Sequence, residues 1–242
     1  MVDPLLFLSS SSLWRMLLLI ALILVFLKKK KNQINVQRWK KSINLTQHKR
    51  IFNRLFHNID GFNLSRIARQ QQNDCIDYTY GEIDFLSFIA LLSLIPMDKN
   101  TIFYDLGSGT GKAVIACAMV YPVHKSIGVE LFSSLHDCAY QQKHQLEAIM
   151  SYKEKATKID FVLGNFLKVN LSEATLIFVN SSTLFGITWE KLCLILDNQA
   201  RLNTVITTSR PLICKSFFLQ ITTQIQMSWG IVLAYIHLRK TN

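Results

Sequence analysis

The chain is poor in the residues that mark unusual architectures. Its 242 residues contain only 4 prolines and 9 glycines, only 18% are charged, and 50% are hydrophobic. This composition excludes collagen-like and intrinsically disordered chains. The sequence also lacks any internal repeat with a period of about 20 to 50 residues, which excludes solenoids. We therefore expect a globular domain of ordinary size, with some residues left over.

Cysteine and histidine are too scattered for a disulfide framework or a metal site. The five cysteines are an odd number and include no C-x-x-C pair, so they do not suit paired disulfides or a zinc site. The six histidines show no H-E-x-x-H spacing, and we expect no metal. A reducing compartment is the natural interpretation of these cysteines.

Negative charge is nearly absent from one segment. Between Lys28 and Gln70, twelve Lys or Arg residues face the single Asp60, so this segment accounts for the whole net charge of +11. Its first part, residues 28–54, suits a solvated stretch attracted to anionic lipid, with nucleic acid as the alternative partner. The charge alone does not decide between the two.

An apolar run precedes these basic residues. Met16–Leu27 is unbroken, and Leu5–Leu27 is 23 residues long, enough at about 1.5 Å per residue to cross a bilayer core of about 30 Å. The lysines that follow it predict, by the positive-inside rule, a carboxyl side in the cytosol. A targeting segment and a buried helix are the alternatives. The expected parts are a single-pass membrane anchor over 1–27 that inserts through 5–27, a basic lead-in over 28–75, and a cytosol-facing domain over 76–242.

A glycine-rich turn joins a predicted strand, residues 101–104, to a predicted helix, residues 112–120. The P-loop is excluded because Leu106 and Ala113 stand where it needs a glycine and a hydroxyl. The dinucleotide fingerprint is excluded because Lys112 replaces its third glycine. The turn instead resembles D-x-G-x-G-x-G, the first motif of class I S-adenosylmethionine-dependent methyltransferases. The matching residues are Asp105, Gly107, Ser108, Gly109 and Gly111.

Side chains after the predicted strands suit the cofactor of that class. Asp105 can hold an ammonium group, and glycines let the backbone approach the methionine part closely. Glu130 ends the next predicted strand and suits the two ribose hydroxyls. After the predicted strand 159–163, Asn165 suits the adenine amine and Phe166 suits the face of the ring.

The alternation of predicted strands and helices indicates an α/β fold. The resemblance to class I methyltransferases implies a Rossmann-like seven-stranded sheet with helices on both faces, here preceded by a single transmembrane helix. Ligands of such sheets bind at the carboxyl ends of the strands. The loops after the strands, including Asn180 after the predicted strand 174–179, are therefore expected to converge on one crevice.

Several blocks together resemble the non-SET histone-lysine methyltransferases of the disruptor-of-telomeric-silencing (Dot-one-like) family, over residues 76 to 238. The blocks are Tyr80-Gly81-Glu82, Asp105–Gly109, Gly128–Glu130, Gly164–Leu167, Ile177–Asn180, Ser209-Arg210-Pro211, Ser228-Trp229 and Tyr235–His237. The resemblance implies a protein-lysine N-methyltransferase that uses S-adenosyl-L-methionine. It also implies a substrate protein, histone or membrane-proximal, whose lysine enters a narrow channel.

The resemblance also implies roles for single residues. Asn180 would orient the amine, and Tyr80, Trp229 and Tyr235 would line the channel. Glu82 would order the entry loop or receive the amine proton. The implied cofactor-binding residues are Glu82, Asp105, Gly107, Ser108, Gly109, Gly111, Lys112, Glu130, Asn165 and Phe166. The departures from the family's pattern are Asn165 for aspartate, Lys112 for glutamine, Ile83 for a hydroxyl residue and Ser181 for the second of two asparagines.

The sequence also leaves other functions open. A second resemblance, to small membrane-anchored protein-lysine methyltransferases of mitochondria and bacteria, rests on the apolar amino terminus before D-L-G-S-G. Methylation of adenine or glutamine is disfavoured because Asn180–Thr183 lacks the prolines of N-P-P-Y. The alternatives are a small-molecule or lipid methyltransferase, and a non-catalytic adaptor that binds the cofactor.

Overall fold

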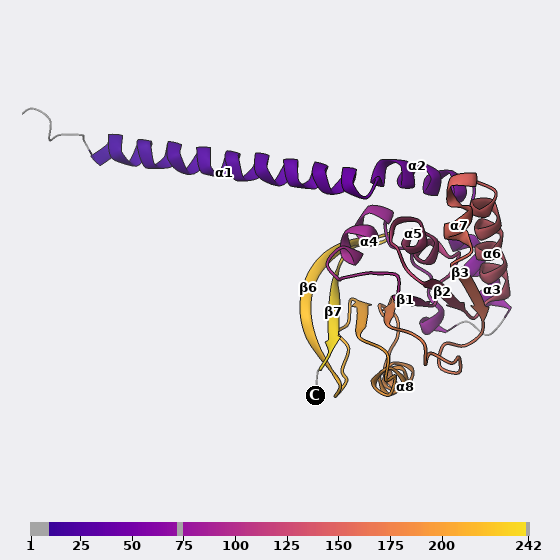
Figure 1. Cartoon of the computed structure of the whole chain (residues 1–242). Coiled ribbons are helices and arrows are strands. Elements are labelled where there is room, and N and C mark those ends of the chain that lie inside the picture. Colours follow the sequence, from indigo (N-terminus) through magenta and orange to yellow (C-terminus); the bar gives the residue numbers. More distant parts are fainter. Residues whose placement is uncertain (1–9, 72–74, 241–242) are drawn as a thin grey trace, which may run out of the picture. The chain divides into compact units, whose positions relative to one another are not determined.

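The computed structural model describes residues 10–71 and 75–240, without the side chains of residues 10–16 and 23 (Figure 1). The chain forms two compact units, Met1–Thr46 and Gln47–Asn242. The first unit consists mainly of one α-helix, α1 (Ser10–Ser42). The predicted segment boundaries at residues 27 and 75 stay predictions. The membrane anchor predicted for the first segment is a separate matter.

The predicted transmembrane helix is wrong. In the described part of the chain, no helix combines the length and the apolar character that crossing a membrane requires. The unbroken run Met16–Leu27 has twelve residues and covers about 18 Å of helix axis, against a bilayer core of about 30 Å. Any longer segment around this apolar run includes Arg15 and serines on its amino-terminal side, or Lys28–Lys31 on its carboxyl-terminal side. Without a transmembrane helix, the predicted single-pass membrane location with a cytosolic domain is wrong as well. Residues 1–9 of the predicted anchor lie outside the described residues.

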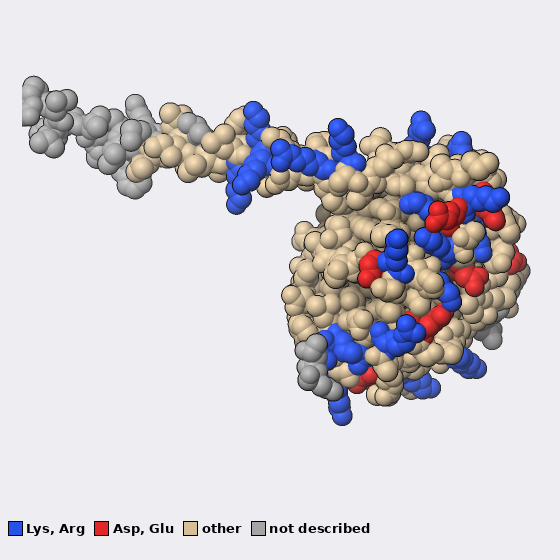
Figure 2. All heavy atoms as spheres, in the orientation of Figure 1, with Lys and Arg blue, Asp and Glu red and all other residues tan. Residues whose placement is uncertain are grey.

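Charge is distributed differently in the two units. On the face shown in Figure 2, the helix of the first unit carries Lys and Arg but no Asp or Glu, whereas both signs intermingle over the second unit. This agrees with the excess of basic residues between Lys28 and Gln70.

The second unit is built on a seven-stranded sheet with the order β3-β2-β1-β4-β5-β7-β6. The first five strands run parallel, and β7 runs antiparallel between β5 and β6. This confirms the predicted Rossmann-like seven-stranded sheet. The strands are β1 (Ile102–Leu106), β2 (Lys125–Glu130), β3 (Ile159–Leu163), β4 (Leu176–Val179), β5 (Thr204–Thr208), β6 (Phe217–Met227) and β7 (Gly230–Arg239).

Helices cover both faces of the sheet (Figure 1). On one face lie α4 (Phe85–Leu92), α5 (Lys112–Val120) and α6 (Ser133–Glu147), and α8 (Gly186–Asp197) lies on the other. Phe103 of β1 contacts Phe88 of α4, whereas Tyr104 packs in the cluster that holds Trp189 of α8. The remaining elements of this unit are α2 (Leu45–Phe56), α3 (Gly61–Gln70), η1 (Ile76–Tyr78), η2 (Met150–Tyr152) and α7 (Lys153–Ala156).

Burial of the central strands positions the site. All five residues of β1 are buried, as expected of a parallel strand covered on both faces. Asp105 in this strand is therefore buried too. The register pairs Leu106 with Val129 of β2 and with Val179 of β4, so the carboxyl ends of three strands meet at one edge.

Candidate functional site

The glycine-rich loop leaves β1 and folds back over the end of β2. The amides of Gly107 and Ser108 both donate to the carbonyl oxygen of Val129, at 2.9 and 3.0 Å. Gly111 precedes α5 with φ +82°, a left-handed conformation that disfavours other residues. A Cβ atom at Gly111 would also lie 2.6 Å from the Phe161 ring. Glycine is therefore required there.

Glu130 ties this loop to the end of β2. Its Oε2 accepts from the Gly109 amide at 2.7 Å, and its Oε1 accepts from the Phe132 amide at 3.0 Å. The side chain is buried, and burial raises its pKa while these backbone donors lower it. Because each carboxylate oxygen has about two acceptor sites, Glu130 can also accept from the hydroxyls of a ligand.

Asp105 is the second buried acid at this edge. Burial, and secondarily the charge of Glu130, raises its pKa to about 8. At neutral pH the side chain is therefore mostly protonated. A cation placed beside it would favour the ionised form and lower its pKa.

Two neighbouring hollows open at the carboxyl edge of the sheet. One is a cavity of about 170 Å³, bordered by Glu130, Asn165 and Phe166 among others. The second, of about 30 Å³, is bordered by residues that include Asp105 and Lys112. The residues that border both are Tyr80, Gly81, Gly107 and Asn180. The structure thus gathers most of the predicted cofactor-binding residues around one edge.

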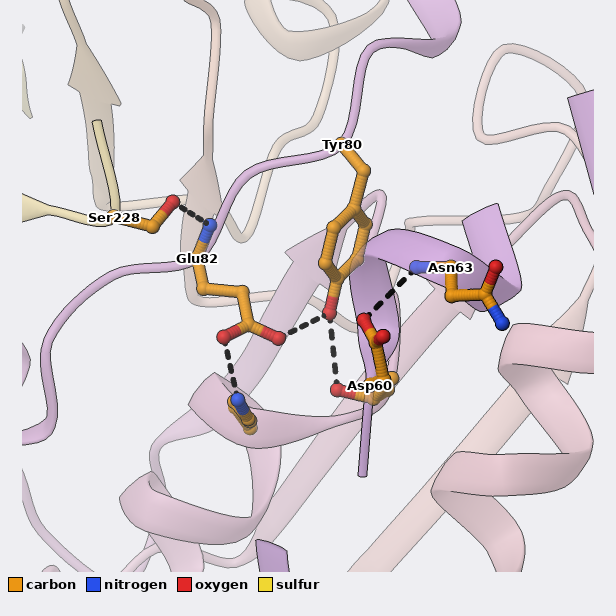
Figure 3. Close-up of polar contacts among 7 residues, drawn as sticks. Asp60, Asn63, Tyr80, Glu82 and Ser228 are labelled. Carbon is orange, nitrogen blue, oxygen red and sulfur yellow. Dashed lines mark hydrogen bonds and ion pairs between the residues drawn. The ribbon is translucent and has the colours of Figure 1, made fainter. Parts of the chain in front are cut away.

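The segment Tyr80–Glu82, here called the strap, runs along this edge (Figure 3). The Tyr80 hydroxyl donates to Glu82 Oε1 at 2.7 Å, and Lys112 Nζ donates to Glu82 Oε2 at 2.5 Å. The Glu82 amide donates to Ser228 Oγ at 3.1 Å. Lys112, which departs from the family's glutamine, therefore provides the counter-charge of Glu82. Burial, followed by the charge of Glu82, raises the pKa of Tyr80, which stays a neutral phenol.

The indole ring of Trp229 packs against Gly81 of the strap. A Cβ atom at Gly81 would lie 1.8 Å from Trp229 Cζ3, so only glycine fits beside the ring. Trp229 borders neither of the two cavities, and its side chain is 48% exposed. It is held there because it belongs to the turn between β6 and β7, and Ser228 beside it binds the strap.

Tyr235 also lies away from the two cavities. It sits within β7, paired with Thr207 of β5 and Thr222 of β6. Of the three aromatic residues predicted to line a channel, only Tyr80 borders the hollows. The channel-lining roles of Trp229 and Tyr235 stay predictions.

The polar residues after β3 and β4 have local partners. Asn165 Oδ1 accepts from the Leu167 amide at 2.8 Å. Asn180 Oδ1 accepts from the hydroxyls of Ser182 and Thr208. Ser181 is fully buried and donates to the Thr208 carbonyl at 2.6 Å. Because this side chain points into the protein, its departure from the family's second asparagine does not alter the cavity wall.

Sequence reasoning missed residues that close the larger cavity. Thr188 of α8 donates to Asp77 Oδ2 of η1 at 2.7 Å, and both residues border this cavity. These residues are 111 positions apart, so no local pattern could have paired them. Ala68 of α3 packs against Phe132 and Leu135. Two signals in the sequence could have predicted α3. One is the amphipathic spacing of its residues. The other is Asp60, which caps the start of the helix by accepting from the Asn63 amide (Figure 3).

Comparison with known proteins identifies the family. The model of the family described as histone methylation protein DOT1 matches residues 68–232. The chain belongs to this family. The match confirms the predicted class of methyltransferase domain and S-adenosyl-L-methionine as the cofactor of that domain.

Two curated relatives match parts of the chain. The H3 lysine-79-specific histone-lysine N-methyltransferase of Caenorhabditis elegans is 30% identical over 109 residues, which is 43% of this chain and 12% of the relative. A protein-lysine N-methyltransferase of Saccharolobus islandicus is 29% identical over 89 residues, which is 36% of this chain and 50% of the relative. The matches thus span half or less of these relatives.

A solved structure supports the fold. A putative RNA methyltransferase from Pyrococcus horikoshii aligns with a TM-score of 0.54 and 15% identity, and the alignment covers 80% of this chain and 98% of that protein. At this identity the likeness concerns the fold alone.

Replacing Asp105 with Asn should stabilise the protein at high pH. The pKa of Asp105 is about 8 in the folded chain against an ordinary value of 3.8, so between these values the folded state binds the extra proton. The stability of the wild type should therefore fall as pH rises towards about 8, by at most about 1.4 kcal/mol per pH unit. Asn removes this dependence.

Urea unfolding of both proteins at pH 5.5, 7 and 8.5 checks this, with the exposed Asp137→Asn as control. The stability of Asp105→Asn relative to the wild type should increase with pH. If the difference in unfolding free energy between Asp105→Asn and the wild type stays constant across the three pH values, the raised pKa of Asp105 is refuted.

Gly81→Ala should destabilise the protein by about 1 to 3 kcal/mol, because the new methyl group overpacks against Trp229. Trp229→Ala should suppress most of this loss, since it removes the ring that the methyl group meets. Urea unfolding of the two single variants and the double variant measures the coupling. Gly164→Ala is the control, since its Cβ atom would meet only Val169 at 3.4 Å. Equal losses with and without Trp229 would contradict the packing described here.

Proposed function

We propose that the chain is an S-adenosylmethionine-dependent protein-lysine N-methyltransferase. The observation that carries the proposal is the pair of buried acids, Asp105 and Glu130, at one hollowed sheet edge of a DOT1-family domain. Two named relatives are a histone-lysine and a protein-lysine N-methyltransferase, which supports a lysine of a protein as the acceptor.

The residues at this edge suit the chemistry of the cofactor. Asp105 would hold the ammonium group, since a cation there compensates for the burial of its charge. Glu130 has acceptor sites left for the two ribose hydroxyls. Phe166, which is half-buried beside the larger cavity, offers a ring face for the adenine. Asn165 keeps one acceptor site for the adenine amine after binding the Leu167 amide.

When bound, the cofactor supplies the methyl group as an electrophile. The protein has to hold the acceptor amine close to this group and to exclude water. Tyr80 and Asn180 border both hollows, and we assign the positioning of the reactants to them. Both oxygens of Glu82 are engaged, by Tyr80 and Lys112, so its proposed role is to order the strap rather than to accept a proton.

The acceptor protein is proposed to be a histone or another protein that presents a lysine. Within the described residues, nothing besides charge connects residues 28–54 with lipid or nucleic acid, so no partner is assigned to them.

Methyl transfer by the full chain tests the function. The chain is incubated with methyl-tritiated S-adenosylmethionine and, separately, with recombinant nucleosomes, a soluble protein extract and a lipid extract, and labelled products are hydrolysed for amino-acid analysis. We expect label in methylated lysine from a protein fraction. Asn180→Ala should lower the rate about tenfold or more, because misplaced reactants react slowly, whereas Asn53→Ala on the exposed face of α2 should not.

Each other outcome contradicts the proposal in a different way. Label in the lipid extract would replace it with a lipid methyltransferase. Cofactor binding without transfer to any fraction would favour a binding adaptor.

A further inference from the structure

The sheet register brings Asn180 and Thr208 together. Strands β4 and β5 run parallel with Val179 beside Thr207, so the next residues of both strands are neighbours at the carboxyl edge. The Thr208 hydroxyl, which is fully buried, donates to Asn180 Oδ1 at 2.7 Å. A buried donor with this geometry makes a well-formed hydrogen bond.

Ser182 provides a second donor to the same oxygen. Its hydroxyl lies 2.8 Å and its amide nitrogen 3.5 Å from Asn180 Oδ1. The Ser182 hydroxyl also lies 3.0 Å from Ser209 Oγ. The backbone of Ser209 is left-handed, at φ +60°, and this turn brings its side chain back towards Ser182. A carbonyl oxygen has two lone pairs. The hydroxyls of Thr208 and Ser182 therefore saturate Oδ1.

This arrangement fixes which end of the Asn180 amide faces the hollows. Because the amide group is planar, binding Oδ1 to Thr208 and Ser182 turns Nδ2 away from them. Asn180 borders both hollows, and none of the hydrogen bonds it forms with other described residues uses Nδ2. The two N–H donors are thus available to a ligand at the site.

We propose that Thr208, assisted by Ser182, is a positioning residue that acts through Asn180. The inference rests on the proposed function and refines the role of Asn180. Held in this way, the amide offers donors, which suit an oxygen atom. Of the two reactants, the cofactor has carboxylate and hydroxyl oxygens, whereas a lysine side chain has none. Asn180 therefore binds the cofactor, and the hydrogens of the amine find another acceptor.

The orientation of the amide can be tested without any ligand. In the full chain labelled with ¹⁵N and ¹³C asparagine, the side-chain signals of Asn180 are those missing from Asn180→Ala. Thr208→Val and Ser182→Ala should each shift the Asn180 ¹³Cγ and ¹⁵Nδ2 signals towards those of exposed asparagines, because each removes a donor to Oδ1. The control is Thr207→Val, in which the lost hydroxyl binds the Arg210 carbonyl instead. Unchanged signals in both test variants would overturn the proposal.

A double-mutant cycle tests the consequence for the cofactor. Calorimetry of S-adenosylmethionine binding to the full chain should show a dissociation constant raised roughly three- to tenfold by Asn180→Ala and by Thr208→Val. Thr208→Ser should restore wild-type affinity. In the Asn180→Ala background, Thr208→Val should have no further effect, because Thr208 acts through the amide.

Independent, additive effects of the two substitutions would show a merely structural role for Thr208 and overturn the proposal. A dissociation constant that Asn180→Ala leaves unchanged would overturn the cofactor as its ligand. If the wild type binds no cofactor at all, the proposed function fails, while the signals of the Asn180 side chain still decide whether Thr208 orients it.

Discussion

The burial of two carboxyl groups at the ends of neighbouring strands is the constraint on which the site depends. Asp105 and Glu130 end up inside the protein because β1 and β2 are inner strands of a sheet covered on both faces. Glu130 offsets its burial with two backbone amides, and one of these belongs to the glycine-rich loop. The loop conformation and the chemistry of the edge thus follow from one buried acid, while Asp105 keeps an elevated pKa that a cationic ligand would lower.

The strap joins this edge to parts of the chain that are distant in sequence. Glu82 binds Lys112 at the start of α5 through its side chain and Ser228 after β6 through its backbone. Trp229 lies on Gly81. Since the strap borders both hollows, a substitution at Lys112 or in the β6–β7 turn would remove a contact that holds the strap at this edge. The lysine at position 112 suits this arrangement, because it neutralises a partly buried carboxylate that a glutamine would leave charged.

Local patterns in the sequence predicted the sheet, the glycine-rich loop and the acids Asp105 and Glu130, because each of these depends on strand periodicity and short spacing. The contacts of Asn180 with Thr208, and of Asp77 with Thr188, could not be predicted, since they join residues brought together only by the sheet register or by loop closure. The prediction of a transmembrane helix was wrong because its 23 residues were reached only by adding a stretch with Arg15 and four serines to an apolar run of twelve residues.

Calorimetry of S-adenosylmethionine binding to the full chain at pH 6.5, in two buffers that differ in ionisation enthalpy, would show whether Asp105 is protonated in the free protein and receives the ammonium group of the cofactor. With a pKa of about 8 in the free protein, Asp105 should ionise on binding, and we expect the release of close to one proton per cofactor bound. Binding with no proton release would contradict it.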